Sequence, residues 1–362
     1  MTSFTKLAAM TALLLSGASA FAAPTMNWNA YYEGYYMYNM NSPETATGTD
    51  ENSGRLNDRN HNSFTTNLVE LGVNGSATKE VSYVIEAGYG DLKDSVYGTV
   101  ARDVLTQGYL SFALPALKGM TFDIGRFYSH MGAESFKAVN NWNFSHSLTY
   151  KYAVPHWNEG LRAHIINKKN MALSAYVLNG WDTEEDLNDS KTLGLKLRFT
   201  PSDKFDIAYN FIGGPEQGTN ESNQRMVHNV NALFAINSKL AALGQFTWGK
   251  EEKAILVDST QKSADWFGVS AAAKYAISND SFVSGRIEHY NAEEGVRILT
   301  VGSPMDLKVT SLTGTYGVTH GEGLQTWFEA RFDKADEDVI REDSTDVEDD
   351  QISFLASLMY EI

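Results

Sequence analysis

The sequence contains no cysteine and only 7 prolines among its 362 residues. Without cysteine the chain has neither disulfides nor thiolate chemistry. After residue 22, no stretch approaches the roughly 18 consecutive apolar residues that a membrane-spanning helix needs. Basic residues are also scarce, because 29 lysines and arginines stand against 45 aspartates and glutamates, which gives a net charge of −16. This acidic balance argues against nucleic acid as a partner, since phosphate binding requires a basic surface.

The first 22 residues have the layout of a secretory signal peptide. Lys6 precedes an apolar run from Leu7 to Leu15, and small residues follow at Ala18, Ala20 and Ala22. The apolar run is too short to span a bilayer, and the alanines offer Ala-x-Ala cleavage sites. A buried N-terminal helix is the alternative. We predict a signal peptide over residues 1–22 and a mature protein over residues 23–362.

Most of the remaining chain alternates between apolar and polar residues, which is the period of a β-strand with two unlike faces. In one clear case Leu193, Leu195 and Leu197 alternate with Gly194 and Lys196. A soluble β-sandwich alternates in the same way, so this pattern alone does not define the environment. Glycine is plentiful, with 29 residues, and aromatic residues reach 12%, which suits a barrel whose strands meet lipid with every second residue.

The connections between the predicted strands decide the architecture. Short links fall near residues 74–79, 115–119, 167–170, 201–204, 236–239, 277–280 and 319–323. Longer links fall near residues 41–60, 91–102, 129–158, 181–190, 213–224, 250–262, 291–304 and 334–350. The two kinds alternate strictly, which indicates an all-β transmembrane antiparallel barrel with short periplasmic turns and long outer loops. Fifteen connections require sixteen strands, and an eighteen-strand count stays open as the alternative.

The third long link, residues 129–158, interrupts the strand pattern with aromatic and histidine residues. A strand over residues 144–152 would exchange the short and long links for the rest of the chain, so this piece belongs to the loop. We predict that loop 3 folds into the lumen and narrows it. Its candidate constriction residues are His130, Glu134, Lys137, His146, Tyr150, Lys151 and His156. Their mostly basic character favours anions or neutral solutes, and the aromatic ones either stack on sugars or pack the loop against the wall.

Charged residues on the other, lumen-facing parity form the candidate wall of a pore. They are Arg162, Lys196, Arg198, Arg286, Glu288, Glu329 and Arg331. Fixed charges of both signs across a narrow aqueous gap would select and orient ions. Alternatively, neighbours such as Arg286 with Glu288 and Glu329 with Arg331 pair with each other and stiffen the wall. The sequence leaves both possibilities open.

The remaining candidate sites indicate neither a metal centre nor an enzyme. Carboxylates crowd residues 333–350 and 182–189, but no calcium-binding loop pattern is present, which favours solvated outer loops. Ser129-His130 and Ser145-His146 are adjacent pairs, and adjacent residues seldom point at each other. No Gly-x-Ser-x-Gly motif accompanies them. We therefore expect no catalytic residues, no metal and no cofactor.

One region of the sequence resembles a known family. Gly125-Arg126-Phe127-Tyr128, Met131-Gly132, Trp142, Phe144-Ser145-His146-Ser147 and Gly160-Leu161-Arg162 are similar to the putative beta-barrel porin type 2 family, the outer-membrane-porin-L-like proteins of Gram-negative bacteria. The similarity is concentrated over residues 105–163, with a weaker echo at Arg286, Glu288 and Tyr290. Barrels of this kind commonly end on Phe, whereas this chain ends on Ile362.

The resemblance implies an outer-membrane porin through which small hydrophilic solutes or ions diffuse passively. A plugged barrel that acts as an adhesin or structural surface protein is the alternative. The expected partners are outer-membrane lipid, lipopolysaccharide and small solutes. A homotrimer is suggested only by analogy with other sixteen-stranded porins.

Overall fold

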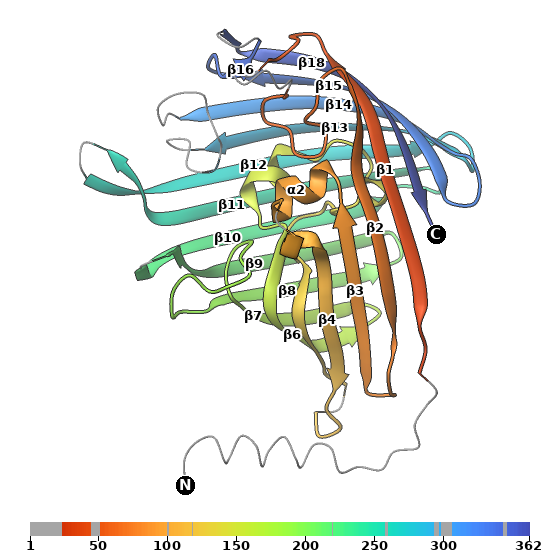
Figure 1. Cartoon of the computed structure of the whole chain (residues 1–362), viewed down its shortest axis with the longest axis vertical. Helices are drawn as coiled ribbons and strands as arrows, with labels where there is room; N and C mark the ends of the chain where they lie inside the picture. The colour runs from red at the N-terminus through yellow and green to blue at the C-terminus, as the bar shows by residue number, and fades with distance from the viewer. Residues whose placement is uncertain are drawn as a thin grey trace.

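Sixteen antiparallel strands form one closed barrel, in which β1 pairs with β18 (Figure 1). The computed structural model describes residues 24–44, 51–99, 101–117, 119–218, 220–257, 260–292, 297, 306–342 and 346–362. The predicted signal peptide over residues 1–22 lies outside them. Closure pairs the backbone of the first strand with that of the last, so the sheet presents no unpaired edge to a bilayer. The prediction of sixteen barrel strands is confirmed.

The barrel strands follow the chain order, and each pairs with its neighbours in sequence. Their bounds are β1 (Asn27–Asn39), β2 (Ser63–Ser76), β3 (Val81–Tyr89), β4 (Leu105–Ala113), β5 (Thr121–Tyr128), β6 (Trp157–Lys168), β7 (Met171–Leu178), β8 (Thr192–Ser202), β9 (Phe205–Gln217), β10 (Asn220–Ala235), β11 (Leu240–Val257), β12 (Thr260–Ala276), β13 (Ser281–Ala292), β14 (Leu307–Thr319), β15 (Leu324–Ala335) and β18 (Asp350–Glu361).

The two faces of the barrel wall invert the usual arrangement of a globular protein. On β14, the apolar side chains of Leu312 and Tyr316 point outward and are 58% and 42% exposed. Ser311 and Thr313, on either side of Leu312, point inward and are buried. An apolar exterior matches lipid, and a polar interior suits water or polar loops, so the alternation read from the sequence reflects this environment.

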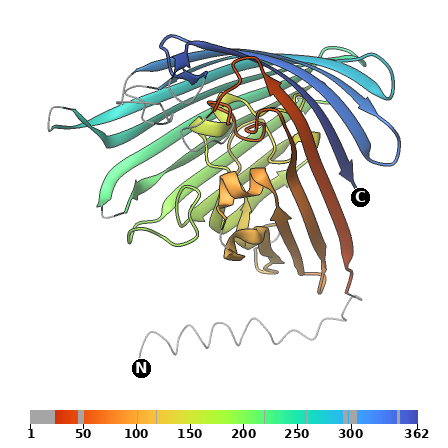
Figure 2. The ribbon, with the colours of Figure 1, turned by 45° about the horizontal axis from the view of Figure 1, so that its top comes forward.

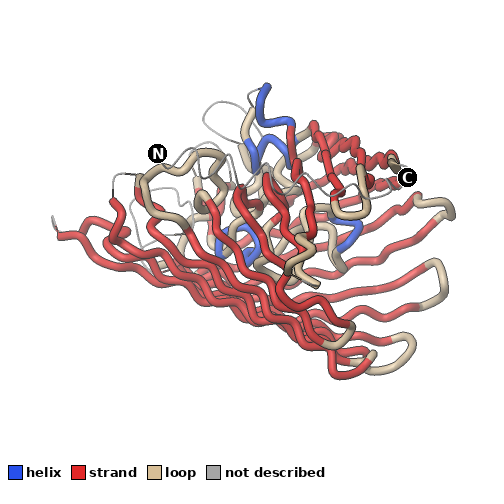
Figure 3. Tube along the Cα trace, turned by 90° about the horizontal axis from the view of Figure 1, so that it is seen from below, coloured by secondary structure: helices blue, strands red, loops and turns tan. Residues whose placement is uncertain are grey.

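The connections at the two ends of the barrel differ in length, as Figure 3 shows for the tan loops between the red strands. One end carries short turns, such as residues 203–204 and 277–280, and the other carries the long loops. Two predicted long loops, 213–224 and 250–262, are instead mostly strand. Here β9 to β12 continue as paired ribbons, with Gly214 opposite Arg225 and Lys250 opposite Asp265.

The last outer loop contains a small sheet of its own, formed by β16 (Ile340–Arg341) and β17 (Val347–Glu348). These two strands pair only with each other, so the eighteen strands of the described chain include sixteen in the barrel. Among the described residues, no helix is long and apolar enough to cross a membrane.

Outer loops fold back into the barrel and fill part of its interior (Figure 2). Loop 3, defined here as residues 129–156 between β5 and β6, contains a 3-10 turn at Ala138–Asn140 and a π-helical turn at Thr149–Ala153. Residues 51–62 of loop 1 and the short helix α2 (Asp91–Tyr97) of loop 2 pack beside it. The buried core therefore lies inside the barrel, and loop 3 supplies Phe136, Phe144, Leu148 and Val154 to it.

Candidate functional site

Loop 3 crosses the lumen and contacts strands on opposite sides of the barrel. The Ala133 amide donates to Gln245 Oε1 on β11, and the Ala138 amide donates to a Glu33 carboxylate oxygen on β1 at 3.0 Å. On the way back, Trp266 Nε1 of β12 donates to the Ala153 carbonyl at 3.3 Å. The prediction that loop 3 folds into the lumen is confirmed.

Loop 3 is also held together by its own side chains. The Ser147 amide donates to Glu134 Oε2 at 3.0 Å, which closes the loop across 13 residues. His146 Nε2 lies 2.8 Å from the Ser135 carbonyl, and the His146 ring stacks on Tyr150 with centroids 4.3 Å apart. The loop is thus a compact folded unit.

An ion pair attaches this unit to the barrel wall. Glu134 Oε1 lies 2.7 Å from Arg286 Nη1 on β13, and both side chains are largely buried. Burial alone would raise the pKa of Glu134, but Arg286 and the hydrogen bonds from Ser147 hold that pKa below its usual value. The Glu134 carboxylate therefore stays ionised at neutral pH.

The wall continues this pairing toward loop 1. Arg286 lies 3.5 Å from Glu288, and Glu288 lies 3.4 Å from Arg331 on β15. Arg331 Nε donates to Asp333 Oδ1 at 2.8 Å. Asp333 in turn contacts Arg55 of loop 1 at 2.7 Å.

Asp58 ends this series at 2.5 Å from Arg55. We call Glu134, Arg286, Glu288, Arg331, Asp333, Arg55 and Asp58 the charge chain. Its members alternate in sign, so each buried charge has at least one opposite neighbour. The charge chain joins loop 3 to loop 1 through two wall strands.

Glu329 holds loop 3 by a different contact. Its carboxylate accepts the backbone amides of Phe144 and Ser145 at 2.7 and 3.0 Å, and the Thr315 hydroxyl at 2.7 Å. The expected pairing of Arg286 with Glu288 is present, whereas Glu329 bonds to loop 3 and Arg331 bonds to Glu288 and Asp333. Four of the predicted wall residues, Arg286, Glu288, Glu329 and Arg331, thus anchor the loop.

The predicted basic residues of loop 3 are engaged in internal contacts. His130 Nε2 lies 2.9 Å from the Phe211 carbonyl, and its ring stacks on Tyr176. Burial lowers the pKa of His130 to about 3, so the ring is neutral at ordinary pH. Burial likewise lowers the pKa of His146. Neither ring therefore offers a positive charge at neutral pH.

Lysines 137 and 151 are bound as well. Lys137 forms an ion pair with Glu70 on β2; burial opposes its charge, but the field of Glu70 raises the pKa of Lys137. Lys151 Nζ donates to the Arg55 carbonyl at 2.5 Å, and burial lowers its pKa to about 7. The basic residues of loop 3 therefore give little support to a preference for anions, because their positive charges are paired with carboxylates or disfavoured by burial.

The last two predicted constriction residues, Tyr150 and His156, pack loop 3 in place and do not form a stacking surface for sugars. Tyr150 is buried between the rings of His146 and His156, and its burial raises the pKa of the phenol. The backbone amide of His156 donates to Asp182 Oδ1 of loop 4 at 2.7 Å. Both residues brace loop 3 where it returns to β6.

The remaining predicted wall residues lie on β6 and β8. Arg162 contacts Asp123 at 2.6 Å, and Arg198 contacts Asp206 at 2.5 Å. Lys196, between them on the inward face, has no hydrogen bond or ion pair with any residue in the described ranges. This side of the wall carries one positive charge more than its carboxylates balance.

Sequence reasoning missed the acceptors on β1 and β2. Glu33 and Glu70 are buried on the inward face and bind the loop at Ala138 and Lys137. Their inward parity was visible in the alternation. Their partners lie more than 60 residues away in sequence, and no local pattern links them.

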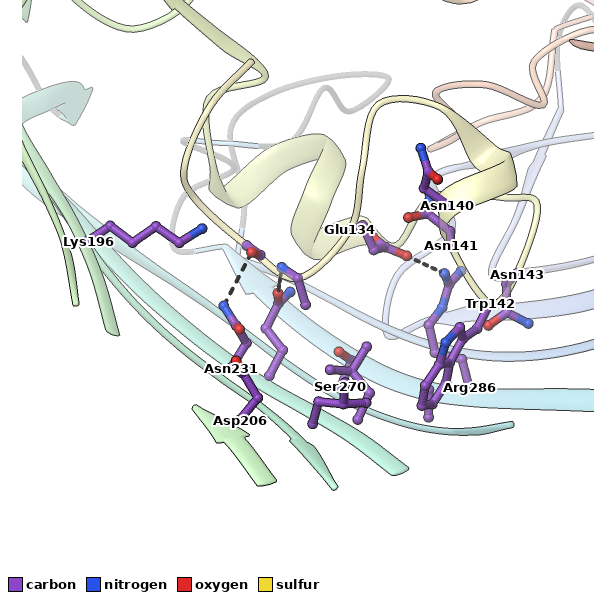
Figure 4. Close-up of a pocket in the computed structure, with 16 residues that line it drawn as sticks. Glu134, Asn140, Asn141, Trp142, Asn143, Lys196, Asp206, Asn231, Ser270 and Arg286 are labelled. Atoms are coloured by element: carbon purple, nitrogen blue, oxygen red, sulfur yellow. Dashed lines mark hydrogen bonds and ion pairs between the residues drawn. The ribbon is translucent and has the colours of Figure 1, made fainter. Parts of the chain in front are cut away.

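Two hydrophilic cavities lie among the loops and the inner wall of the barrel. The outer one, about 340 Å³, is lined by residues of loops 2 and 4 with Arg126 and Trp157. The inner one, about 330 Å³, lies against loop 3 residues 132–134 and 140–143 and extends to Asp206 and Leu233 near the short turns (Figure 4). Loop 3 therefore lines the inner cavity, whereas no residue of loop 3 lines the outer one.

The two segments of the sequence motif meet on adjacent strands. Gly125 of β5 pairs with Gly160 of β6, and both have positive φ, 130° and 155°. A Cβ at Gly125 would lie 2.2 Å from the Gly108 carbonyl oxygen, so glycine is required there. Beside this pair, Arg126 Nη2 bonds Glu159 at 3.0 Å, and loop 3 leaves the wall two residues later.

A closed sixteen-stranded barrel with a loop folded inside it defines the class of outer-membrane porins. The sequence matches the family described as "Putative beta-barrel porin-2, OmpL-like" over residues 25–362, and the chain belongs to that family. The protein is thus located in the bacterial outer membrane. No curated protein matches the sequence.

Solved structures show the same fold at low sequence identity. The anion-selective porin from Comamonas acidovorans has a TM-score of 0.63 and 9% identity, with 94% of this chain and 100% of that chain covered. The outer membrane channel DcaP of Acinetobacter baumannii has a TM-score of 0.61 and 11% identity, with coverage of 96% and 100%. A trimer form of OmpT of Vibrio cholerae has a TM-score of 0.61 and 11% identity, with coverage of 94% and 100%.

Proposed function

We propose that this porin lets small hydrophilic solutes and ions diffuse passively across the outer membrane, with loop 3 as the constriction. The observation that carries this proposal is that loop 3 crosses the lumen from β1 to β11 and lines a hydrophilic cavity of about 330 Å³ against the inner wall. A single folded loop then narrows the lumen beside this cavity, and the gap that it leaves sets the size limit for solutes.

The chemistry of the inner wall supports a conduit for polar solutes. Arg162, Lys196 and Arg198 on one side project into the lumen with Asp123 and Asp206, so ions and hydroxylated solutes find polar partners along the way. We propose a channel and not an enzyme. In the two Ser-His pairs of loop 3, the ring of His130 bonds the Phe211 carbonyl and the ring of His146 bonds the Ser135 carbonyl.

Single-channel conductance in planar bilayers tests the proposal. The mature chain is refolded in detergent, its folding is verified by heat-dependent migration in gel electrophoresis, and currents are recorded in KCl. Stepwise ohmic openings are expected, and the reversal potential under a salt gradient gives the ion preference. Persistent silence from folded protein would contradict passive diffusion.

A second candidate is a plugged barrel that serves as an adhesin or structural surface protein. It is favoured by the contacts of loop 3 with β1, β11, β12, β13 and β15 and by the packing of Asn57 of loop 1 on the Phe144 carbonyl at 2.7 Å. Such a barrel would bind its partner through the outer loops. Silence in bilayers together with binding of the folded protein to lipopolysaccharide or host surfaces would support it.

We also propose that the barrel assembles as a homotrimer in a lipid and lipopolysaccharide environment. The trimer form of the structurally similar OmpT supports this assembly. The mass of the detergent-solubilised protein, measured by light scattering with the detergent contribution subtracted, tests it. A monomeric mass across the concentration range in which the barrel stays folded would contradict it.

A further inference from the structure

The inner cavity beneath loop 3 has the features of a binding site for a solute. Its volume of about 330 Å³ lies at the lower end of the roughly 300–1,000 Å³ typical of small-molecule sites. The floor of loop 3 supplies Asn140, Trp142 and Asn143, and the wall supplies Lys196, Gln245 and Ser270. Loop 3 closes one end of this space, so a solute that enters from the periplasmic side would be retained in the cavity.

One lysine of the cavity has no ion-pair partner among the residues that the structure describes. Of the charged lining residues, Glu134 pairs with Arg286 at 2.7 Å and Asp206 pairs with Arg198 at 2.5 Å, whereas Lys196 has no ion pair or hydrogen bond in the described ranges. Figure 4 shows the Lys196 side chain at one end of the cavity, extending toward loop 3. A lysine ammonium is a compact, mobile point charge, which suits a single carboxylate better than a planar pair of acceptors.

Neutral hydrogen-bonding groups complete the lining. Gln245 is 5% exposed; its Oε1 accepts the Ala133 amide, while its Nε2 has no partner among the described residues. Ser270 and Asn143 add further neutral polar side chains to the lining, and Trp142 lies at the end of the cavity beside Arg286 (Figure 4). Neutral amide and hydroxyl groups are suited to a hydroxyl-bearing carbon skeleton.

We propose that this cavity binds a small hydroxylated monocarboxylate of the sugar-acid class, with Lys196 holding the carboxylate and Gln245 donating to a hydroxyl. The assignment deepens the proposed channel function and rests on it, since a solute must reach the lumen. The single surplus charge explains why one carboxylate, and not a dianion, matches the site.

Calorimetry tests the proposal. It measures the binding of sodium D-gluconate to the refolded mature protein in detergent, with D-glucose as the neutral match. Saturable gluconate binding in about the millimolar range is expected, with glucose at least tenfold weaker, a ratio equivalent to about 1.4 kcal/mol. Lys196→Met should weaken gluconate at least tenfold and leave glucose unchanged. Lys204→Met, at an exposed position in a periplasmic turn, is the matched control and should change neither.

Equal affinity for gluconate and glucose, or a gluconate affinity that Lys196→Met leaves intact, would overturn the proposal. Heat-dependent gel migration confirms that each variant is folded. Conductance in KCl is recorded in parallel and separates the two proposals. Open channels without gluconate binding would reject the sugar-acid site and leave the porin function standing. Gluconate binding without conductance would reject passive diffusion and leave the binding site standing.

Discussion

Glu134 in loop 3 lies 2.7 Å from Arg286 on β13, and this ion pair connects the folded loop to a chain of alternating charges in the barrel wall. The same Glu134 carboxylate accepts the Ser147 amide across the loop. One side chain therefore both shapes loop 3 and attaches it to the wall, which makes it the most direct point at which to loosen the constriction.

Glu134→Gln should destabilise the docked position of loop 3. The amide keeps some hydrogen bonds but removes the charge opposite Arg286, which retains Glu288 at 3.5 Å. Since one partner remains, we expect a cost of about 1–3 kcal/mol, below the roughly 3–5 kcal/mol for a buried charge left alone. Faster hydrogen exchange of loop 3 amides, with the barrel strands unchanged, would show this loss.

Glu185→Gln is the matched control for that experiment, because Glu185 lies exposed in loop 4. It should leave exchange in loop 3 unaltered. Equal exchange rates in Glu134→Gln and the parent protein would show that the ion pair contributes nothing to docking.

A glycine on β12 makes room for the π-helical turn of loop 3. A Cβ placed on Gly268 would lie 2.2 Å from Thr149 Oγ1, so Gly268→Ala should push this turn away at a cost of roughly 1–3 kcal/mol. Gly244 has no atom within 4 Å of the equivalent Cβ position, and Gly244→Ala is the control. Protease cleavage within loop 3 should accelerate only in the Gly268 variant.

Removing the obstructing atoms should restore the loop. In Gly268→Ala combined with Thr149→Ala, the Thr149 hydroxyl and methyl groups are gone and the Thr149 Cβ remains 3.2 Å from the new methyl group. Cleavage should return toward the parent rate. Rapid cleavage that persists in the double variant would mean that the β12 backbone itself is distorted.

Acid should release loop 3, because its histidines are buried in the neutral form. The pKa of His130 falls from 6.5 to about 3 on burial, and that of His146 is also lowered. Below pH 6.5 the histidines of the displaced loop bind protons, whereas those of the docked loop stay neutral. Docking therefore weakens as pH falls toward 3. For His130 alone the loss reaches about 2 kcal/mol at pH 5.

Hydrogen exchange of loop 3 between pH 7 and pH 5, corrected for the intrinsic pH dependence of exchange, measures this effect. This range lies above the titration of Glu134, whose lowered pKa would add a loss of the same sign at lower pH. In a His130→Gln, His146→Gln variant the corrected protection should become nearly independent of pH. A pH dependence that survives in the double variant would assign the titration to other groups.

The sequence predicted which residues face inward and offered the local pairing of Arg286 with Glu288, but it did not predict which of them contact loop 3. Period-two alternation placed Arg286, Glu288, Glu329 and Arg331 on the lumen face, because strand parity is a local property. The contact between Glu134 and Arg286 spans 152 residues and depends on how loop 3 folds across the barrel, which no local pattern encodes.

The missed strand ends have a related cause. Near Gly214 and Lys250 the ribbons of β9 to β12 extend past the other strands, where the outward face no longer needs lipid-facing apolar residues. The alternation fades there, although backbone pairing continues, and the segments therefore resembled loops. The short turns at the other end were predicted well because the alternation there continues close to the turn, as Leu197 and Phe199 show on β8.

Deletion of residues 139–150, with a short Gly-Ser linker in their place, should raise conductance several-fold and reduce ion selectivity while the barrel still folds. Every barrel strand pairs with its two neighbours without help from this segment, so heat-resistant migration should persist. The deletion removes the Phe144 and Ser145 amides from Glu329 and the Ser147 amide from Glu134, and water would then solvate the freed carboxylates. Unchanged conductance from the folded deletion variant would mean that ions bypass loop 3, and the constriction would have to be sought among residues of loops 1 and 2.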